Sequence, residues 1–155
     1  MATKLTPNSE LVAVTYIRSL GAAPSATSGV GTTLPEATSS WIDGFVQIQV
    51  VGGSSDIDVP SKHPIVQLDV YVPAINSSKP QWGKAETIAA DIVEKLYALD
   101  NEGKELVLGT SFKNARVQTA YAVSEPRRIF NDPGGHARYT VDVALHWVTV
   151  EPPTA

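Results

Sequence analysis

The 155-residue chain contains no cysteine. It can therefore form no disulfide framework, no thiolate nucleophile, no cysteine-ligated zinc site and no iron–sulfur cluster. Charged residues are also scarce, at 18%, against about 25% in an average soluble domain. A surface with few charges costs less to desolvate, which mildly favours permanent contacts with other proteins.

Basic residues are outnumbered, with 12 Lys and Arg against 16 Asp and Glu, which gives a net charge of -4 and a pI near 5.3. This balance supplies no general attraction to nucleic acid or to anionic lipid. Long hydrophobic runs are missing too, and residues 1–7 lack the apolar segment of a signal peptide. We expect a protein that is made in the cytoplasm and does not enter a membrane.

Catalytic and ligand-binding motifs are sparse. The chain has three histidines, and none of them stands at a spacing typical of metal ligands. Asp142 and His146 share one face of an expected strand, but four residues place them about 13 Å apart, too far for a hydrogen bond. The segment 29–31 lacks the third glycine and the strand-to-helix context of a dinucleotide-binding loop. We therefore expect no enzyme, no cofactor and no metal.

The length and the 43% content of hydrophobic residues indicate a single domain over residues 1–155 with a core of its own. Two segments have the spacing of apolar residues that is typical of helices. The first begins at Thr6 as N-cap and Pro7 as first helical residue, and it ends at Gly21. The second and stronger one covers residues 82–99.

Alternation of apolar and polar residues predicts strands over 45–51, 65–72, 115–123 and 139–149, and a short strand over 30–34. We expect the first two to pair, with Gly52-Gly53 ending the first of them. In 115–123 the pattern places Val117, Thr119, Tyr121 and Val123 on one face, and Trp147 falls in register with the buried residues of the last strand. The predicted fold is α+β, a mostly antiparallel sheet of about four to five strands with two helices packed on one face.

Three polar segments, 22–40, 54–64 and 124–137, are predicted to be extended loops. The last two are longer than simple connections require, so we expect them to dock on partners. Trp41 lies in a polar segment before a strand, where it is either pinned beneath the loop or presented to a partner. The candidate interface residues are Trp41, Asp56, Asp58, His63, Arg127, Arg128, Ile129, Phe130 and Asp132.

The order of these segments is more specific than any one of them. An opening helix that ends IRSLG is followed by GTTLP at 31–35, FVQIQVVGG at 45–53, PIVQLDVYV at 64–72, the alanine-rich KAETIAA at 84–90 and RYTVDVALHW at 138–147. This ordered set resembles the tail terminator proteins of long-tailed bacteriophages, particularly those that infect actinobacteria. The resemblance covers nearly the whole chain and includes no catalytic motif.

The resemblance implies a homohexameric ring that caps the last ring of the tail tube, stops its polymerisation and offers a surface to the head connector. The implied partners are further copies of this chain, the major tail tube protein and a head–tail connector protein, while DNA passes through the lumen without specific binding. The implied location is the head-proximal end of the virion tail, after assembly in the bacterial cytoplasm. Two alternatives stay open: a head–tail connector or stopper of the neck, and a small ligand-binding or enzymatic α+β domain.

Overall fold

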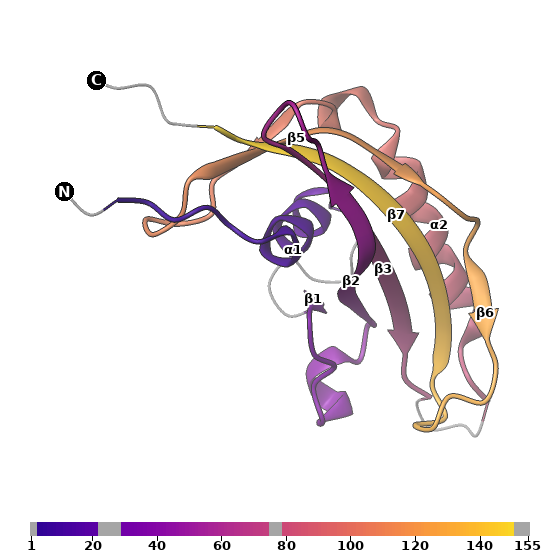
Figure 1. Ribbon diagram of the computed structural model, residues 1–155. Helices are drawn as coiled ribbons and strands as arrows, with labels where there is room; N and C mark the ends of the chain where they lie inside the picture. The colour runs from indigo at the N-terminus through magenta and orange to yellow at the C-terminus, as the bar shows by residue number, and fades with distance from the viewer. Residues whose placement is uncertain (1–2, 22–28, 75–78, 151–155) are drawn as a thin grey trace.

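A computed structural model describes residues 3–21, 29–74 and 79–150 of the chain (Figure 1). Within these residues a seven-stranded sheet has the strand order β1-β2-β3-β7-β5-β4, and β6 pairs with β7 outside this path. The elements, in chain order, are α1 (Ser9–Ser19), β1 (Val30–Gly31), the short 3₁₀ helix η1 (Thr38–Trp41), β2 (Phe45–Ser55), β3 (Ser61–Val72), α2 (Trp82–Leu96), the 3₁₀ helix η2 (Leu99–Asn101), β4 (Lys104–Leu106), β5 (Asn114–Ala122), β6 (Arg127–Ile129) and β7 (Ala137–Val150).

The sheet is antiparallel except where β1 pairs with β2. The predicted α+β class is confirmed, and β2 pairs with β3 as expected. The sheet has more strands than the four to five predicted, because β1, β4 and β6 are only two or three residues long. Alternation cannot be recognised over so few residues. The short strand predicted over 30–34 is accordingly confined to β1.

The core lies between one face of the sheet and both helices. Along β7, Tyr139, Val141, Val143, Leu145 and Trp147 are buried, as their alternation predicts. The buried faces of α1 and α2 join the same cluster, in which α1 contacts β1 to β4 and α2 contacts β3, β5 and β7. The placement of both helices on one face of the sheet is therefore confirmed.

The helix boundaries differ from the predicted ones at two points. The N-cap of α1 is Asn8, whose side-chain oxygen accepts a hydrogen bond of 2.8 Å from the backbone N–H of Leu11. Thr6 is not the cap and Pro7 is not the first helical residue, because Asn8, two residues farther along, offers the same kind of acceptor and the helix begins at Ser9. Helix α2 begins at Trp82 as predicted but ends at Leu96, and the chain tightens into η2 by Leu99.

Strand β5 carries an irregularity that the sequence pattern hides. Its register against β7 shifts between Val117 and Thr119, which reverses the faces of the residues that follow. Ala120 is buried, while Tyr121 is 42% and Val123 is 52% exposed. The prediction that Val117, Thr119, Tyr121 and Val123 lie on one face was therefore wrong beyond the bulge.

Two predicted loops contain paired strands instead. Most of 54–64 belongs to the β2–β3 hairpin, which continues through Gly52-Gly53 to a turn at 56–60. The segment 124–137 contains β6, which pairs with the same edge of β7 as β5 does, farther along the strand. Of 22–40, residues 22–28 lie outside the described residues, and the remainder contains β1 and part of η1.

Candidate interaction surfaces

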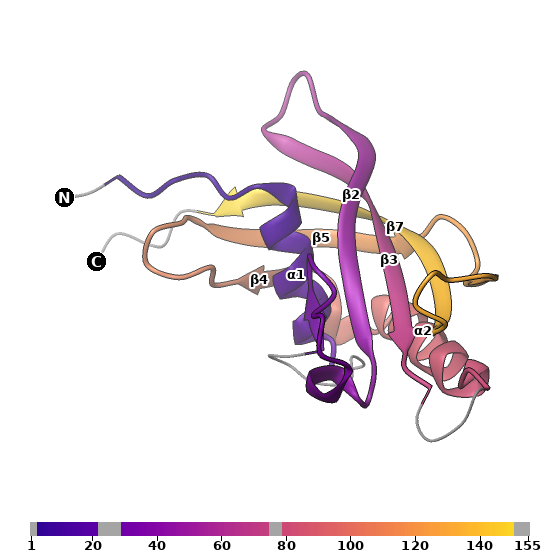
Figure 2. The ribbon, with the colours of Figure 1, turned by 90° about the horizontal axis from the view of Figure 1, so that it is seen from below.

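The end of the β2–β3 hairpin extends beyond the body of the molecule. Figure 2 shows it projecting away from the rest of the sheet. The register shift between Val50 and Gly52 bends β2 at this point, and Gly53 has a positive φ of 106°. A Cβ on Gly53 would clash with the backbone oxygen of His63, so only glycine lets the paired strands continue here. We call residues 52–60 the hairpin arm.

The tip of the hairpin arm is exposed, apolar and acidic. Residues 52–60 are all exposed, and Ile57 is 97% exposed. The turn is ordered by its backbone: Asp56 donates its N–H to the oxygen of Ser61 at 2.9 Å, and Asp56 Oδ1 accepts from the N–H of Asp58 at 3.1 Å. In the described part of the chain, neither carboxylate has a cationic partner. Asp56 and Asp58 thus flank an isoleucine that is almost fully exposed.

His63 lies at the base of the arm rather than at its tip. Its Nε2 is 2.9 Å from Ser61 Oγ, and its ring stacks on that of His146 at 4.2 Å. Burial and the neighbouring His63 lower the pKa of His146 below its usual value. The pair joins β3 to β7 on the face of the sheet that carries no helix, with Tyr121 edge-on to His146 at 5.9 Å.

A second exposed surface is built where β6 passes the start of α2. The Arg128 guanidinium lies 4.5 Å from the centre of the Trp82 ring and 5.4 Å from that of Phe130. The centre of the Trp82 ring also lies 6.2 Å from that of the Phe130 ring and 6.3 Å from that of the Tyr139 ring. We call Trp82, Arg128 and Phe130 the aromatic platform. Phe130 is 67% exposed, so the platform presents an aromatic ring and a cation side by side.

Sequence reasoning selected Arg128 and Phe130 but missed Trp82. The register of β6, in which Arg128 faces Tyr139 on β7, brings Arg128 to the face that carries the helices, where α2 begins with Trp82. No local signal in the sequence joins these two segments. The long-range strand pairing alone creates the platform.

The other candidate residues of this segment have structural contacts. Arg127 points to the opposite face and pairs with Asp142 at 3.8 Å, and Ile129 is half-buried. Asp132 Oδ2 accepts from the backbone N–H groups of Gly134 at 3.0 Å and His136 at 3.3 Å, which shapes the turn between β6 and β7.

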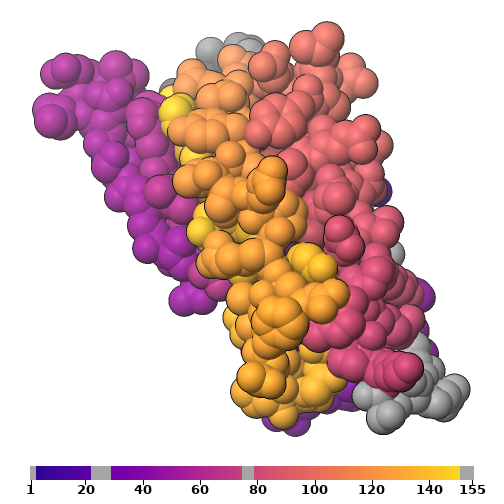
Figure 3. Space-filling view, turned by 90° about the vertical axis from the view of Figure 1, so that its right-hand side faces the viewer, coloured from indigo at the N-terminus to yellow at the C-terminus, as the bar shows by residue number. Residues whose placement is uncertain are grey.

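A groove of about 360 Å³ runs between α2 and the segment before β6 (Figure 3). Ala90, Val93 and Tyr139 give it an apolar floor, and Glu86 and Glu125 stand among its lining residues. The charge around this groove is therefore negative, whereas Arg128 makes the neighbouring platform positive.

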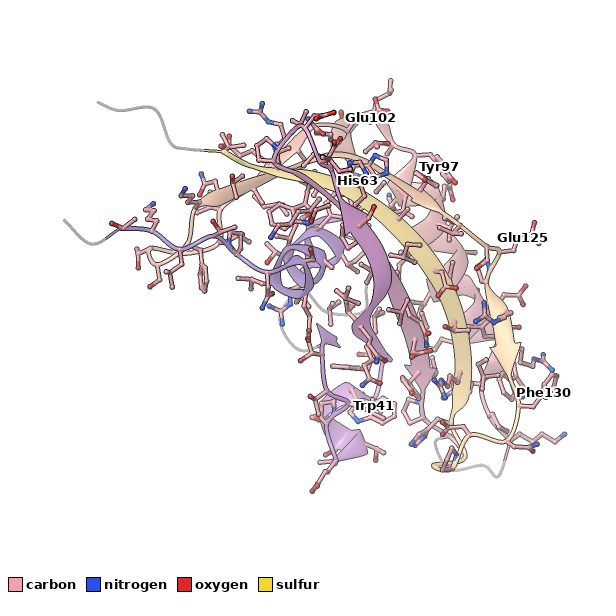
Figure 4. The ribbon with its side chains drawn as sticks, viewed as in Figure 1. Trp41, His63, Tyr97, Glu102, Glu125 and Phe130 are labelled. Atoms are coloured by element: carbon pink, nitrogen blue, oxygen red, sulfur yellow. The ribbon has the colours of Figure 1, made fainter. Side chains whose placement is uncertain are left out.

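Trp41 is buried, with 3% of its surface exposed. Its Nε1 donates to the oxygen of Pro35 at 3.0 Å, and its ring meets those of Tyr71 and His136 edge-on. Of the two placements left open for this residue, the structure shows the one beneath the loop. Figure 4 shows Trp41, His63 and Phe130 at three separate places on the molecule. The candidate residues thus form distinct surfaces and do not converge on one site.

Several titratable side chains of the described residues are engaged in structural contacts. Asp142 pairs with Arg127, and His146 stacks on His63, so these two do not act together. Asp69, which is buried, binds Arg138 at 3.2 Å. Over 3–21, 29–74 and 79–150 no group of three or more His, Asp or Glu side chains is placed to hold a metal ion. No helix in those ranges is long and apolar enough to span a bilayer.

No protein-family model matches the chain, and no curated protein matches it. Among solved structures, it is similar to a chain described as "Virion of native gene transfer agent (GTA) particle", with a TM-score of 0.49 and 14% identity over 84% of this chain and 83% of that one.

Proposed function

We propose that this chain is a structural virion protein, a tail terminator that forms a ring on the last ring of the tail tube and stops its growth. The order of sequence segments over nearly the whole chain supports the proposal. In the structure, the two alternating segments at 45–53 and 64–72 form one continuous hairpin, and the segment at 138–147 is the strand that pairs beside it.

The observation that carries the proposal is the exposed hairpin arm. A ring subunit needs two different side surfaces, because each copy meets one neighbour with one surface and the other neighbour with the second. The arm and the aromatic platform are two such surfaces, and they lie far apart along the strands, because the arm begins beside Val148 of β7 whereas β6 pairs with residues 138–140 (Figure 1). The chain exposes 8647 Å², and two ring contacts at about 800 Å² each would cover about a fifth of it.

The distribution of polar groups supports a structural rather than a catalytic role. Catalysis needs a nucleophile, a base or a metal within reach of one another. In the described residues, carboxylates and imidazoles that lie close together are used in ion pairs, stacking or turns. We propose that the chain catalyses no reaction.

The negative net charge of -4 suits a ring through which DNA moves without adhering, because an acidic lumen repels the phosphate backbone. In this proposal the ring contacts the major tail tube protein on one end and a head–tail connector on the other. The finished ring then lies at the head-proximal end of the virion tail.

The experiment is deletion of the gene from its phage, followed by electron microscopy of the tails. The proposal predicts tails of excessive and variable length without attached heads. Tails of normal length beside separate, DNA-filled heads would move the protein to the neck as a connector or stopper. Infectious virions of normal shape would overturn both structural roles.

A further inference from the structure

The hairpin arm leaves a large apolar side chain almost fully in water. Ile57 is 97% exposed and Val59 is 52% exposed at the tip. The turn that carries them is nevertheless ordered by two hydrogen bonds: the Asp56 N–H donates to the backbone oxygen of Ser61, and the Asp58 N–H donates to Asp56 Oδ1. Because the turn is already ordered, it would lose little conformational freedom on binding, which suits the tip to insert into a partner.

The negative charge of the tip favours a partner surface that carries a cation. Asp56 and Asp58 flank Ile57, and in the described part of the chain no cation pairs with them. The nearest basic side chain in the hairpin, Lys62, lies over the Trp147 ring at 5.2 Å. The tip therefore presents an apolar side chain between two unpaired carboxylates, which calls for an apolar surface bearing a cation.

The aromatic platform has this complementary chemistry. The Arg128 guanidinium carbon lies 4.5 Å from the centre of the Trp82 ring and 5.4 Å from that of Phe130. A guanidinium held over aromatic rings in this way still has N–H donors that can bind a carboxylate. In the described part of the chain Arg128 has no carboxylate partner. The exposed ring of Phe130 lies beside it. The neighbouring groove is less suitable, because Glu86 and Glu125 would repel the acidic tip.

One chain cannot join its own two surfaces. The arm continues the β2–β3 hairpin at one end of the sheet, while β6 pairs with the β7 residues 138–140 at the other end, and the views in Figures 1 and 2 both separate them. We propose that the tip of the hairpin arm of one copy docks on the aromatic platform of the next copy. Asp58 or Asp56 then meets Arg128, and Ile57 packs on Phe130.

This contact rests on the proposed function, since it specifies how neighbouring copies of the ring meet. It is heterologous, with a different surface from each copy, so it leaves one free arm and one free platform on every dimer. Such a contact gives a closed ring when the rotation between neighbouring copies closes, as the proposed function requires.

The absence of native cysteine makes site-specific cross-linking a direct test. Ser55→Cys labels the arm and Pro133→Cys labels the turn after Phe130, both at exposed positions that leave the tip and the platform intact. Ser111→Cys, exposed on the connection between β4 and β5, is the matched control. Purified single-cysteine variants are mixed in pairs and treated with a short bismaleimide, and the yield of mixed dimer is measured.

We expect the Ser55→Cys and Pro133→Cys pair to give about ten times more mixed dimer than the control pair of Ser55→Cys and Ser111→Cys. A tenfold difference corresponds to about 1.4 kcal/mol of binding free energy. Adding Asp58→Arg to the arm-labelled chain should reduce the yield to the control level. Adding Arg128→Glu to the platform-labelled chain should restore part of it, because the charges are then exchanged.

Equal yields from the two pairs, no cross-link with either, or cross-linking mainly between two arms would overturn the contact. So would a yield that Asp58→Arg leaves unchanged. The result is independent of the tail phenotype: overlong tails after gene deletion without this cross-link would retain the proposed function and reject the contact. If the cross-link forms but gene deletion leaves virions of normal shape, the contact is retained and the proposed function is rejected.

Discussion

The two halves of the β2–β3 hairpin are stabilised by different interactions. In the first half, Val46 and Ile48 pair with Val70 and Leu68 and are buried beneath the helices. In the second half, beyond Gly53, the strands remain paired but every residue from 52 to 60 is exposed. The first half is stabilised by burial of apolar surface, whereas the arm depends on backbone hydrogen bonds and on glycine geometry.

Within this one hairpin, the buried half therefore contributes to folding, and the exposed arm is free to bind a partner. Substitutions in the buried half should change the stability of the chain, while substitutions at the tip should change only what the chain binds. The comparison is tested by changing each half, and the junction between them, in turn.

The largest effect is expected from Leu68→Ala in the buried half. Leu68 is fully buried, with Ile48 and Val141 beside it in the sheet. Removing its side chain should lower the free energy of unfolding by about 2–5 kcal/mol, through lost burial and the cavity that remains. Chemical denaturation measures the change. Ile57→Ala at the tip is the matched control and should alter stability by about 0.5 kcal/mol at most; equal losses in both variants would refute the comparison.

A second effect is expected at alkaline pH, from a core residue of α1. Burial, reinforced by the charge of Glu102, raises the pKa of Tyr16 to about 12, and its hydroxyl donates to the oxygen of Asn101 at 3.4 Å. The unfolded chain then loses this proton first, so the stabilisation present below pH 10 should be lost as the pH rises toward 12. At about 1.4 kcal/mol per pKa unit, the loss is about 2–3 kcal/mol.

Denaturation between pH 8 and 12 measures this loss. Tyr16→Phe should remove most of the pH dependence in that range, because it has no proton to lose. A profile that Tyr16→Phe leaves unchanged would assign the loss to other groups.

An intermediate effect is expected at the junction of the two halves. Gly53→Ala places a Cβ against the backbone of His63 at a positive φ and should cost about 1–3 kcal/mol. Gly52→Ala is the control, because a Cβ there meets nothing within 4 Å. Amide hydrogen exchange should show loss of protection in the arm of Gly53→Ala alone; identical behaviour of the two variants would contradict the role of Gly53.

The smallest effect on stability is expected from the histidine pair at the base of the arm. Burial, together with His63, lowers the pKa of His146 below the usual value of 6.5. The unfolded chain therefore binds the proton more readily, so the contribution is present above pH 6.5 and is lost as the pH falls below it. His146→Gln should flatten this part of the profile, as measured by denaturation at pH 5 and pH 7.5. An unchanged slope would show that His146 does not make this contribution.

The sequence predicted the buried half well and the exposed half poorly. Alternation identified the strands around Ile48, Leu68 and Val143 because one face of each is buried. From Gly52 to Pro60 every residue is exposed, so no alternation of buried and exposed residues marks this part of the hairpin as a strand. The bulge at Val117 in β5 likewise leaves no trace in the pattern, which is why Tyr121 was assigned to the wrong face.

The candidate surfaces were predictable in part. Asp56, Asp58, Arg128 and Phe130 stood out as charged or aromatic residues in segments too long for simple connections. Trp82 could not be joined to Arg128, because that contact depends on the pairing of a three-residue strand with β7. Trp41 could be placed only when the structure showed Pro35 and Tyr71 around it.

The central claim is that the hairpin arm binds a neighbouring copy, whereas the rest of the chain provides the stability of the fold. It is tested most directly in a phage that lacks the gene and receives a copy carrying Asp56→Lys, Ile57→Ser and Asp58→Lys, after the purified variant is shown to unfold at the same denaturant concentration as the unaltered chain. The account predicts overlong tails without heads, as in the deletion. Tails of normal length joined to heads would contradict it.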